Sequence, residues 1–301
     1  MPAAVEQTVR QRIVEASAVL PTYGAVGGWA SLRWLGGSWF TGEHHGRTLE
    51  VTLSLMDRSA RPRTGIATSE ERLDPTQIAA YAGIRVTNAA YALLFEIRYA
   101  DTDLEALIAA DMAAYDDLVS RNELALIVAQ SPGWTGIGRG RTVVGLMDEN
   151  AWSPAEVAMR CIWVDEAGLP RPLTNRPVFD LGGRLLGTPD LLDPVYGVAG
   201  EYDSTLHLET GRRRQDLERE SRFRSVGLEP VAMVTGELAE PWRFIGRLHA
   251  AYAAAERRGA SERRWTIEPP GWWTPTQTVA LRRALTADQR GRWLRYRHPA
   301  A

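Results

Sequence analysis

The sequence predicts a mixed α+β protein with two domains, and three observations support this fold class. The chain has 301 residues, which is more than a single hydrophobic core usually organises. Short alternating stretches typical of strands, such as 84–87 and 198–203, are interspersed with amphipathic stretches of helical period. A loop rich in Gly and Pro at 131–141 precedes a helix start at Ser153, so we place the domain boundary near Asn150.

The composition is that of an ordinary globular protein. Hydrophobic residues make up 45% and charged residues 24%, and no apolar run reaches transmembrane length. The first residues lack the basic and apolar regions of a signal peptide, and Cys161 is the only cysteine, so no internal disulfide can form. We therefore expect a cytoplasmic protein without a membrane partner. The oligomeric state stays open.

All 35 basic residues are arginine. The absence of lysine excludes Schiff-base catalysis and the lysine of a phosphate-binding loop. The net charge is −2, but residues 242–301 carry twelve arginines against four acids, a net charge of +8, so the rest carries −10. Tryptophans among these arginines suit contact with single-stranded nucleic acid, although they could equally pack back onto the core as part of a tail helix.

The N-terminal domain, 1–150, is expected to be rich in helix. Its first two helices could form a helix–turn–helix that reads DNA, but we prefer packing in the core. Glu43-His44-His45 has no third metal ligand nearby in the sequence, so we interpret it as an exposed loop, and GIGRGR at 136–141 as another loop. The expected elements are helices at 4–19, 26–35, 89–100, 104–117 and 123–129, and strands at 49–55 and 84–87.

The C-terminal domain, 151–258, is expected to open with a helix. Ser153 is its N-cap, and Glu156 completes a capping box, which is a sufficient structural reason for this acid. A three-stranded antiparallel meander follows, and a salt-bridged helix then leads to a fully buried strand parallel to its neighbour. The elements are helices at 153–167, 212–226 and 242–257, strands at 178–181, 184–186, 187–192, 198–203 and 230–234, and a tail helix at 276–297 within the segment 259–301.

The hairpin around the turn at 193–197 carries the most informative chemistry. If it is centred between Val195 and Tyr196, Asp190 lies opposite Glu201, and Asp203 shares that face. Like charges opposed in this way repel each other, and a bound hard cation would turn that repulsion into binding energy. We therefore predict that all three acids hold Mg²⁺ or Mn²⁺. His207, just beyond, could then act as a general acid or base.

An ordered series of residues over about 150–235 resembles the very-short-patch-repair-like endonuclease domain of the PD-(D/E)xK nuclease superfamily, of the type found in actinobacteria. The series is Glu156, Arg160, Gly168-Leu169-Pro170, Pro172, Asn175, Asp180, Gly183, Asp190-Leu191, Glu201-Tyr202-Asp203, His207, Asp216, Arg219-Glu220 and Gly227. The resemblance implies a restriction-endonuclease-like fold, a mixed sheet flanked by helices. It also places Glu156 near the metal as a further catalytic acid.

Two positions depart from the family pattern. Ser204 stands where the family usually has glycine, and Asp203 stands where much of the superfamily has a water-activating lysine. Asp216 and Arg219 match the family's D..R pair, and the basic stretch Arg212-Arg213-Arg214 could meet phosphates, so we predict that these four arginines contact DNA.

Residues 83–127 are similar in their pattern to the middle region of the abortive-infection type IV antitoxin family, although the winged helix that usually opens such proteins is absent or shortened. The sequence therefore leaves two functions open. The first is a metal-dependent DNA endonuclease or nicking enzyme that hydrolyses phosphodiester bonds. The alternative is a catalytically inactive nuclease fold that binds nucleic acid or acts as an antitoxin-like regulator.

Overall fold

The structure, a computed structural model, describes residues 7–56, 63–203, 210–258 and 262–297, and their side chains except at 210–217 and 296. The chain divides into two compact mixed α+β units, Met1–Glu149 and Asn150–Ala301. The division falls beside the predicted boundary, and the expected tail segment lies within the second unit. None of the helices in these ranges is long and apolar enough to cross a membrane.

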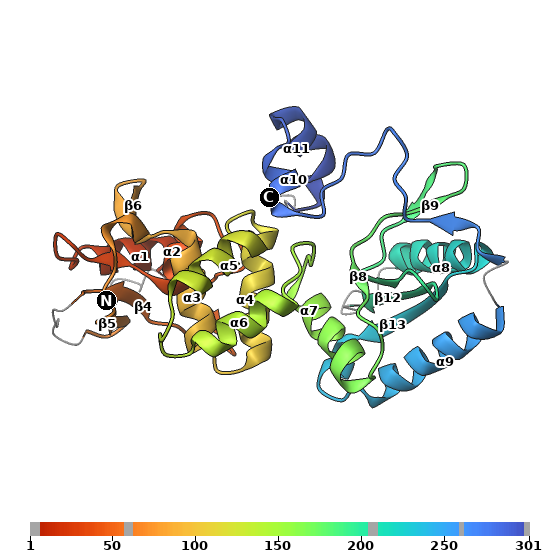
Figure 1. The fold of residues 1–301 in the computed structure, drawn as a ribbon, viewed down its shortest axis with the longest axis horizontal. Coiled ribbons are helices and arrows are strands. Elements are labelled where there is room, and N and C mark those ends of the chain that lie inside the picture. The colour runs from red at the N-terminus through yellow and green to blue at the C-terminus, as the bar shows by residue number, and fades with distance from the viewer. Residues whose placement is uncertain (1–6, 57–62, 204–209, 259–261, 298–301) are drawn as a thin grey trace. The chain divides into compact units, whose positions relative to one another are not determined.

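The first unit contains a five-stranded mixed sheet in the order β5-β4-β1-β7-β6 (Figure 1). The central strand β1 is antiparallel to β4 and parallel to β7, and Val26 pairs with both Leu53 and Val86. All three side chains are fully buried, so the middle of the sheet belongs to the core. The strands are β1 Ala25–Val26, β4 Val51–Ser54, β5 Ile66–Ser69, β6 Ile78–Tyr81 and β7 Ile84–Thr87, beside a separate hairpin of β2 Glu43–His44 and β3 Arg47–Thr48.

The helices of the first unit pack around α3, whose side chains Leu93, Leu94 and Ile97 are fully buried. Several helices begin at a side-chain N-cap; Asn88 caps α3 and Thr102 caps α4. The helices predicted in this part of the chain are confirmed, with small differences at their ends. The confirmed helices are α1 Val9–Ser17, α2 Gly28–Trp34, α3 Ala89–Tyr99, α4 Asp103–Tyr115 and α5 Arg121–Gln130, and the structure adds α6 Ile137–Leu146.

Helix α2 is a core helix. Six of its seven residues are buried, among them Trp29 and Trp34, and the strand β1 separates it from α1. Helices α1 and α2 therefore do not form a helix–turn–helix with an exposed recognition helix, in agreement with the preferred interpretation of core packing.

The prediction of a loop at 136–141 is wrong, because these residues begin α6. Gly136, at φ +76°, is the N-cap, a conformation that glycine adopts without strain. A Cβ on Gly140 would lie 3.2 Å from Val128 Cγ2 and 3.3 Å from Leu94 Cδ1. Glycines at this helix start therefore allow close packing, which outweighs their poor helix propensity.

The second unit is built on a four-stranded sheet in the order β13-β12-β11-β8. β11 and β12 form the predicted antiparallel hairpin, and α8 leads from β12 to the parallel strand β13, as predicted. β13 alternates rather than being fully buried: Val231 and Met233 lie in the core, but Ala232 does not. The elements are α7 Pro154–Cys161, a π-helical turn Ile162–Glu166, β8 Leu173–Thr174, β11 Leu191–Asp193, β12 Val198–Asp203, α8 Thr210–Ser225, β13 Glu229–Val234 and α9 Trp242–Arg258.

Helices α8 and α9 lie against the two faces of this sheet (Figure 1), and each face has its own apolar cluster. On one face Leu191 and Val198 pack with Trp163 and with Phe244 of α9. On the other face Leu192 and Ala199 pack with Phe223 of α8. Because successive residues of a strand alternate between faces, Glu201 lies on the α8 face and Tyr202 on the α9 face. The sequence predicted that these two side chains point to opposite faces.

The predicted meander is wrong, because its strands belong to two sheets. β9 Val178–Asp180 pairs with β10 Leu185–Gly187 and with β14 Trp265–Thr266, whereas β11 pairs with β8 and β12. The predicted strand 187–192 is interrupted by Thr188-Pro189-Asp190. Proline has no N–H for a ladder hydrogen bond, which explains the interruption.

The single tail helix predicted at 276–297 is also wrong. The structure has α10 Val279–Arg283 and α11 Ala287–Trp293, followed by a short 3₁₀ turn. Thr286 starts the second helix, because its side chain accepts a hydrogen bond from the Gln289 N–H and the Gln289 side chain accepts one from the Thr286 N–H.

Candidate functional site

The turn between β11 and β12 sets the register of the hairpin. Asp193 Oδ1 accepts hydrogen bonds from the N–H groups of Val195 (2.7 Å) and Tyr196 (3.0 Å). The strand pairing runs to Leu191 opposite Gly200, and Asp190 directly precedes the paired residues. This alignment of the strands is the predicted one, and Asp190 and Glu201 therefore lie at the same end of the hairpin.

Helix α7 brings Glu156 to this end of the sheet. Its Oε2 accepts from the Trp152 N–H at 2.7 Å and from Asn175 Nδ2 at 2.6 Å, and Ser153 Oγ donates to Oε1 at 3.0 Å. Ser153 is the predicted N-cap, but the carboxylate of Glu156 reaches the Trp152 N–H rather than that of Ser153. Glu156 is 6% exposed, so its carboxylate is held by donors and largely withdrawn from solvent.

Asp190 lies beside Glu156 in the same largely buried region. Its Oδ2 accepts from the Tyr202 N–H at 2.6 Å, and its carbonyl oxygen accepts from the Asn175 N–H at 2.9 Å. Asn175 therefore connects the two acids, since its backbone contacts Asp190 and its side chain contacts Glu156.

The pKa values of both acids are raised. Burial, followed by the negative charge of Asp190, raises the pKa of Glu156 to about 7, against the lowering effect of its three hydrogen-bond donors. Burial also raises the pKa of Asp190, although the Tyr202 N–H and the charge of Arg219 act in the opposite direction. Two buried acids that repel each other form the kind of site that a cation stabilises.

Arg219 of α8 is the cation that the structure places here. Its guanidinium lies 2.9 Å from Glu201 Oε1 and donates to the Thr188 carbonyl oxygen at 2.5 Å. It also lies 5.5 Å from the centre of the Phe223 ring. In this structure Arg219 contacts the predicted metal site, although it was predicted to contact DNA phosphate.

The structure places the remaining predicted site residues as follows. Asp203 ends β12, two residues beyond Glu201, and is partly exposed. The side-chain oxygens of Asp190, Glu201 and Asp203 do not form a group whose members all lie within 4.8 Å of one another. His207 lies outside the described residues, as do the side chains of Arg212, Arg213 and Arg214.

Asn175 is a member of this site that sequence reasoning did not assign to it. It is 2% exposed and has a φ of +46°, a left-handed conformation that asparagine tolerates better than most residues. The available signals were its place in the residue series that resembles the nuclease family and its position directly before Arg176-Pro177, which is typical of a turn, but neither reveals its partners.

A cavity of about 250 Å³ lies next to the two acids, within the second unit. Asn175 and Thr188, which contact the acids or Arg219, form part of its wall. The complete lining consists of Asn150, Trp152, Asn175, Pro177, Thr188, Trp273, Thr276, Gln277, Arg292, Trp293 and Arg295. The cavity thus combines aromatic side chains, amides and arginines.

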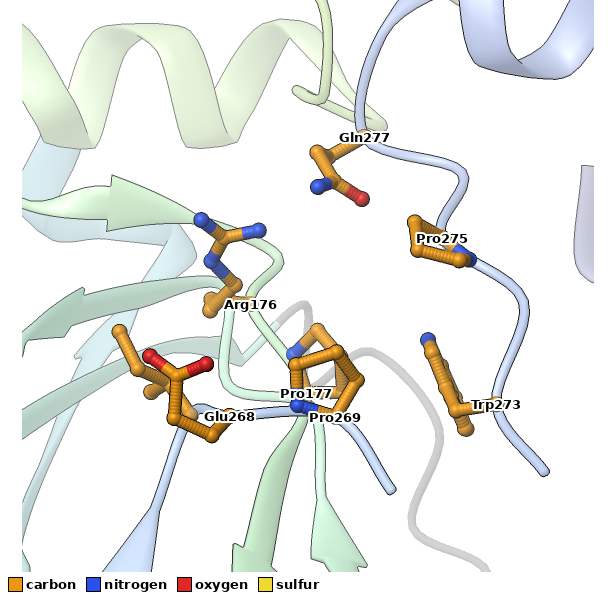
Figure 2. Close-up of a pocket in the computed structure, with 8 residues that line it drawn as sticks. Arg176, Pro177, Glu268, Pro269, Trp273, Pro275 and Gln277 are labelled. Atoms are coloured by element: carbon orange, nitrogen blue, oxygen red, sulfur yellow. The ribbon is translucent and has the colours of Figure 1, made fainter. Parts of the chain in front are cut away.

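A second, smaller pocket of about 140 Å³ adjoins this cavity, since the two share Pro177, Trp273 and Gln277. Figure 2 shows the C-terminal segment with Trp273 and Gln277 on one side and the loop with Arg176 and Pro177 on the other. Two hollows with arginine and tryptophan walls therefore lie along the contact between this loop and the tail.

The tail tryptophans pack back onto the second unit, as one of the two sequence interpretations predicted. Trp273 and Trp272 contact the ring of buried Phe179 edge-on, with centroid distances of 5.3 and 6.0 Å, and Trp293 lies 4.8 Å from Trp273. Trp272 nevertheless remains 51% exposed. These side chains are thus partly structural and partly accessible.

The chain matches no protein-family model, and comparisons with curated proteins and with solved structures give no significant match. The fold and the site by themselves define the class: a two-unit α+β protein whose second unit carries a buried acid pair beside an arginine–glutamate pair.

Proposed function

We propose that the second unit is a metal-dependent DNA endonuclease or nicking enzyme that hydrolyses phosphodiester bonds. The observation that supports this most strongly is that Asp190 lies close enough for its charge to raise the pKa of Glu156, while Arg219 acts on Asp190 and pairs with Glu201. A buried acid whose pKa is raised by a neighbouring carboxylate suits a protein that gains stability or activity when a cation is present.

The donor types present fit a hard divalent cation, which would have to draw the oxygens of Asp190, Glu201 and Asp203 closer together and displace Arg219 from Glu201. Carboxylate and amide oxygens are the ligands that Mg²⁺ and Mn²⁺ prefer, and Asp190, Glu201 and Asp203 would supply them. When bound, such an ion would polarise the scissile phosphate and lower the pKa of a coordinated water. Glu156 holds its neighbours in place through its three hydrogen bonds, so we assign it a positioning role rather than that of a ligand.

The protein's own residues would then perform the remaining tasks. Tyr202 N–H and the Asn175 backbone orient Asp190. In a chain without lysine, His207 would carry the proton transfer, because its ordinary pKa lies near neutrality. Arg292 and Arg295, in the wall of the neighbouring cavity, could meet backbone phosphates, and Arg212, Arg213 and Arg214 are further candidates.

A plasmid-nicking assay with Mg²⁺ or Mn²⁺ tests this function. Asp190→Asn keeps an oxygen for the Tyr202 N–H but removes the charge, and we expect nicking to fall at least about 100-fold, since metal-assisted hydrolysis depends on the ion for several kcal/mol. The matched control is Asp165→Asn, which removes an exposed acid and should retain wild-type activity. Equal nicking by wild type and Asp190→Asn would refute the assignment.

One observation favours a second function, a catalytically inactive nuclease fold that binds nucleic acid or acts as an antitoxin-like regulator. The Arg219 guanidinium already neutralises Glu201 at 2.9 Å, so one predicted metal ligand has a cation from the protein itself. Titration calorimetry with Mg²⁺ and Mn²⁺ separates the two functions. Salt-sensitive DNA binding in EDTA, without nicking and without metal binding that depends on Asp190, would favour the second.

A further inference from the structure

A second group of potential ligands lies in the first unit, far along the chain from the acids described above. His44 and His45 belong to the β2–β3 hairpin, and Glu105 lies in the first turn of α4. His44 Nε2 is 3.2 Å and His45 Nε2 is 3.3 Å from the same oxygen, Glu105 Oε1. The sequence alone predicts an exposed loop here, because no third ligand lies nearby along the chain, and α4 supplies that ligand.

The turn of the hairpin explains how two consecutive histidines face the same carboxylate. His44 pairs with Arg47, which leaves His45 and Gly46 as the two loop residues, with φ values of +47° and +72°. Positive φ at both positions is typical of a type I′ turn. Consecutive strand residues point to opposite faces, but the turn conformation releases His45 from that rule, and the ring centroids lie only 4.2 Å apart.

The third ligand is held in position by its own helix start. The Thr102 N–H donates to Glu105 Oε2 at 3.0 Å, and the Glu105 N–H donates to Thr102 Oγ1 at 3.1 Å, so a capping box fixes the side chain. This leaves Oε1 facing the two imidazoles. Partial burial raises the pKa of Glu105, but the Thr102 N–H, the His45 ring and the charge of His44 lower it further, and the net shift is downward.

We propose that His44, His45 and Glu105 form a binding site for a divalent transition metal, with Zn²⁺ as the preferred ion. Zinc ligands at about 2.0–2.1 Å in a tetrahedron lie about 3.3 Å from one another, which matches the two nitrogen–oxygen distances of 3.2 and 3.3 Å. Imidazole ligands also favour zinc over Mg²⁺. The site does not depend on the proposed nuclease function.

The surroundings leave room for a fourth ligand. Asp101 Oδ2 lies 4.0 Å from His44 Nε2 and its side chain is 83% exposed, so either this carboxylate or a water can complete the tetrahedron. Glu43, the other nearby acid, is occupied elsewhere: Thr48 Oγ1 donates to its Oε1 at 2.9 Å, and Arg12 lies 3.8 Å from the same oxygen. Bound zinc would join the β2–β3 hairpin to α4.

Titration calorimetry of the full chain with ZnCl₂ tests the site, after removal of any affinity tag and of bound metal. We expect one Zn²⁺ per chain. His45→Asn retains a residue suited to the left-handed turn, and Glu105→Gln retains an acceptor for the Thr102 N–H, so both variants preserve the local structure. Each should weaken zinc binding at least tenfold. The control is His249→Ala, which removes an exposed histidine of α9 in the second unit and should leave the affinity unchanged.

Binding of Co²⁺ supplies an independent readout, because tetrahedral cobalt gives intense visible absorption bands that an octahedral surface complex does not. Appearance of these bands in the wild type and their loss in His45→Asn would support the proposal. Two results would overturn it: no zinc binding by the wild type, which would leave only a histidine–carboxylate ion pair, or equal affinity in wild type, His45→Asn and Glu105→Gln.

Discussion

Replacing Glu156 by glutamine and by alanine separates the charge of this buried acid from its role as a hydrogen-bond acceptor. Its pKa rises from 4.5 to about 7 in the folded protein, so between these pH values the folded state binds more protons than the unfolded state. Folding stability therefore falls as pH rises through this interval. At about 1.4 kcal/mol per unit, the loss between pH 4 and pH 8 is about 3 kcal/mol.

Glutamine can form the same hydrogen bonds as the protonated carboxylic acid of Glu156. Its carbonyl oxygen can accept from the Trp152 N–H and Asn175 Nδ2, and its NH₂ can donate to Ser153 Oγ. We therefore expect Glu156→Gln to match the wild type near pH 5 and to exceed it at pH 8 by up to about 3 kcal/mol. Alanine leaves two buried donors without an acceptor, which should cost about 2–4 kcal/mol near pH 5.

Urea denaturation in EDTA at several pH values measures these differences, because EDTA removes any cation that would compensate the acids. Midpoints are compared at equal m-values, so that a change in midpoint reports a change in stability. Adding Mg²⁺ should then restore wild-type stability more at pH 8 than at pH 5, if an ion binds beside Asp190 and Glu201. A wild-type stability that rises with pH, or a Glu156→Gln variant as unstable as the alanine variant, would falsify the reasoning about this acid.

Two further substitutions test the packing that supports the site. A Cβ on Gly200 would lie 2.8 Å from Trp163 Cζ3, so Gly200→Ala should destabilise the protein by about 1–3 kcal/mol in urea denaturation, and an unchanged midpoint would contradict this packing. Tyr252→Phe removes the hydroxyl that donates to buried Asp193 Oδ2 at 2.7 Å and accepts from Trp163 Nε1 at 3.2 Å. We expect a loss of about 1.5–3 kcal/mol in the free energy of unfolding. The amide hydrogens of the β11–β12 turn should also exchange faster, because the turn opens more readily. Exchange rates equal to those of the wild type would argue against the role of Tyr252.

Local sequence signals predicted the structure correctly where a residue's neighbours in sequence are also its neighbours in space. The N-cap at Ser153, the strand 198–203 and the alignment of the two hairpin strands, with Leu191 opposite Gly200, all follow from short-range patterns, and the structure confirms them. Errors arose where long-range packing outweighs local preference. In α6, for example, Gly140 is helical at a position where Val128 and Leu94 pack closely against it.

The candidate site shows the same division. Charge patterning alone indicated that acids gather at the β11–β12 hairpin, since strand alternation and turn geometry are local rules. The identity of the opposing cation was a tertiary outcome, because Arg219 of α8 reaches Glu201 only after the crossover helix has packed on the sheet. Asn175 likewise joins Asp190 and Glu156 from a loop that the sequence does not connect to either.

The sequence by itself determined the α+β class, the order of most elements, the hairpin register and the absence of lysine from any catalytic role. Only the tertiary structure decided which helix covers each face, which acids are buried together, and that Glu105 lies beside His44 and His45. The physical reason is that side-chain contacts between residues far apart in the chain depend on how whole elements pack, which no local pattern encodes.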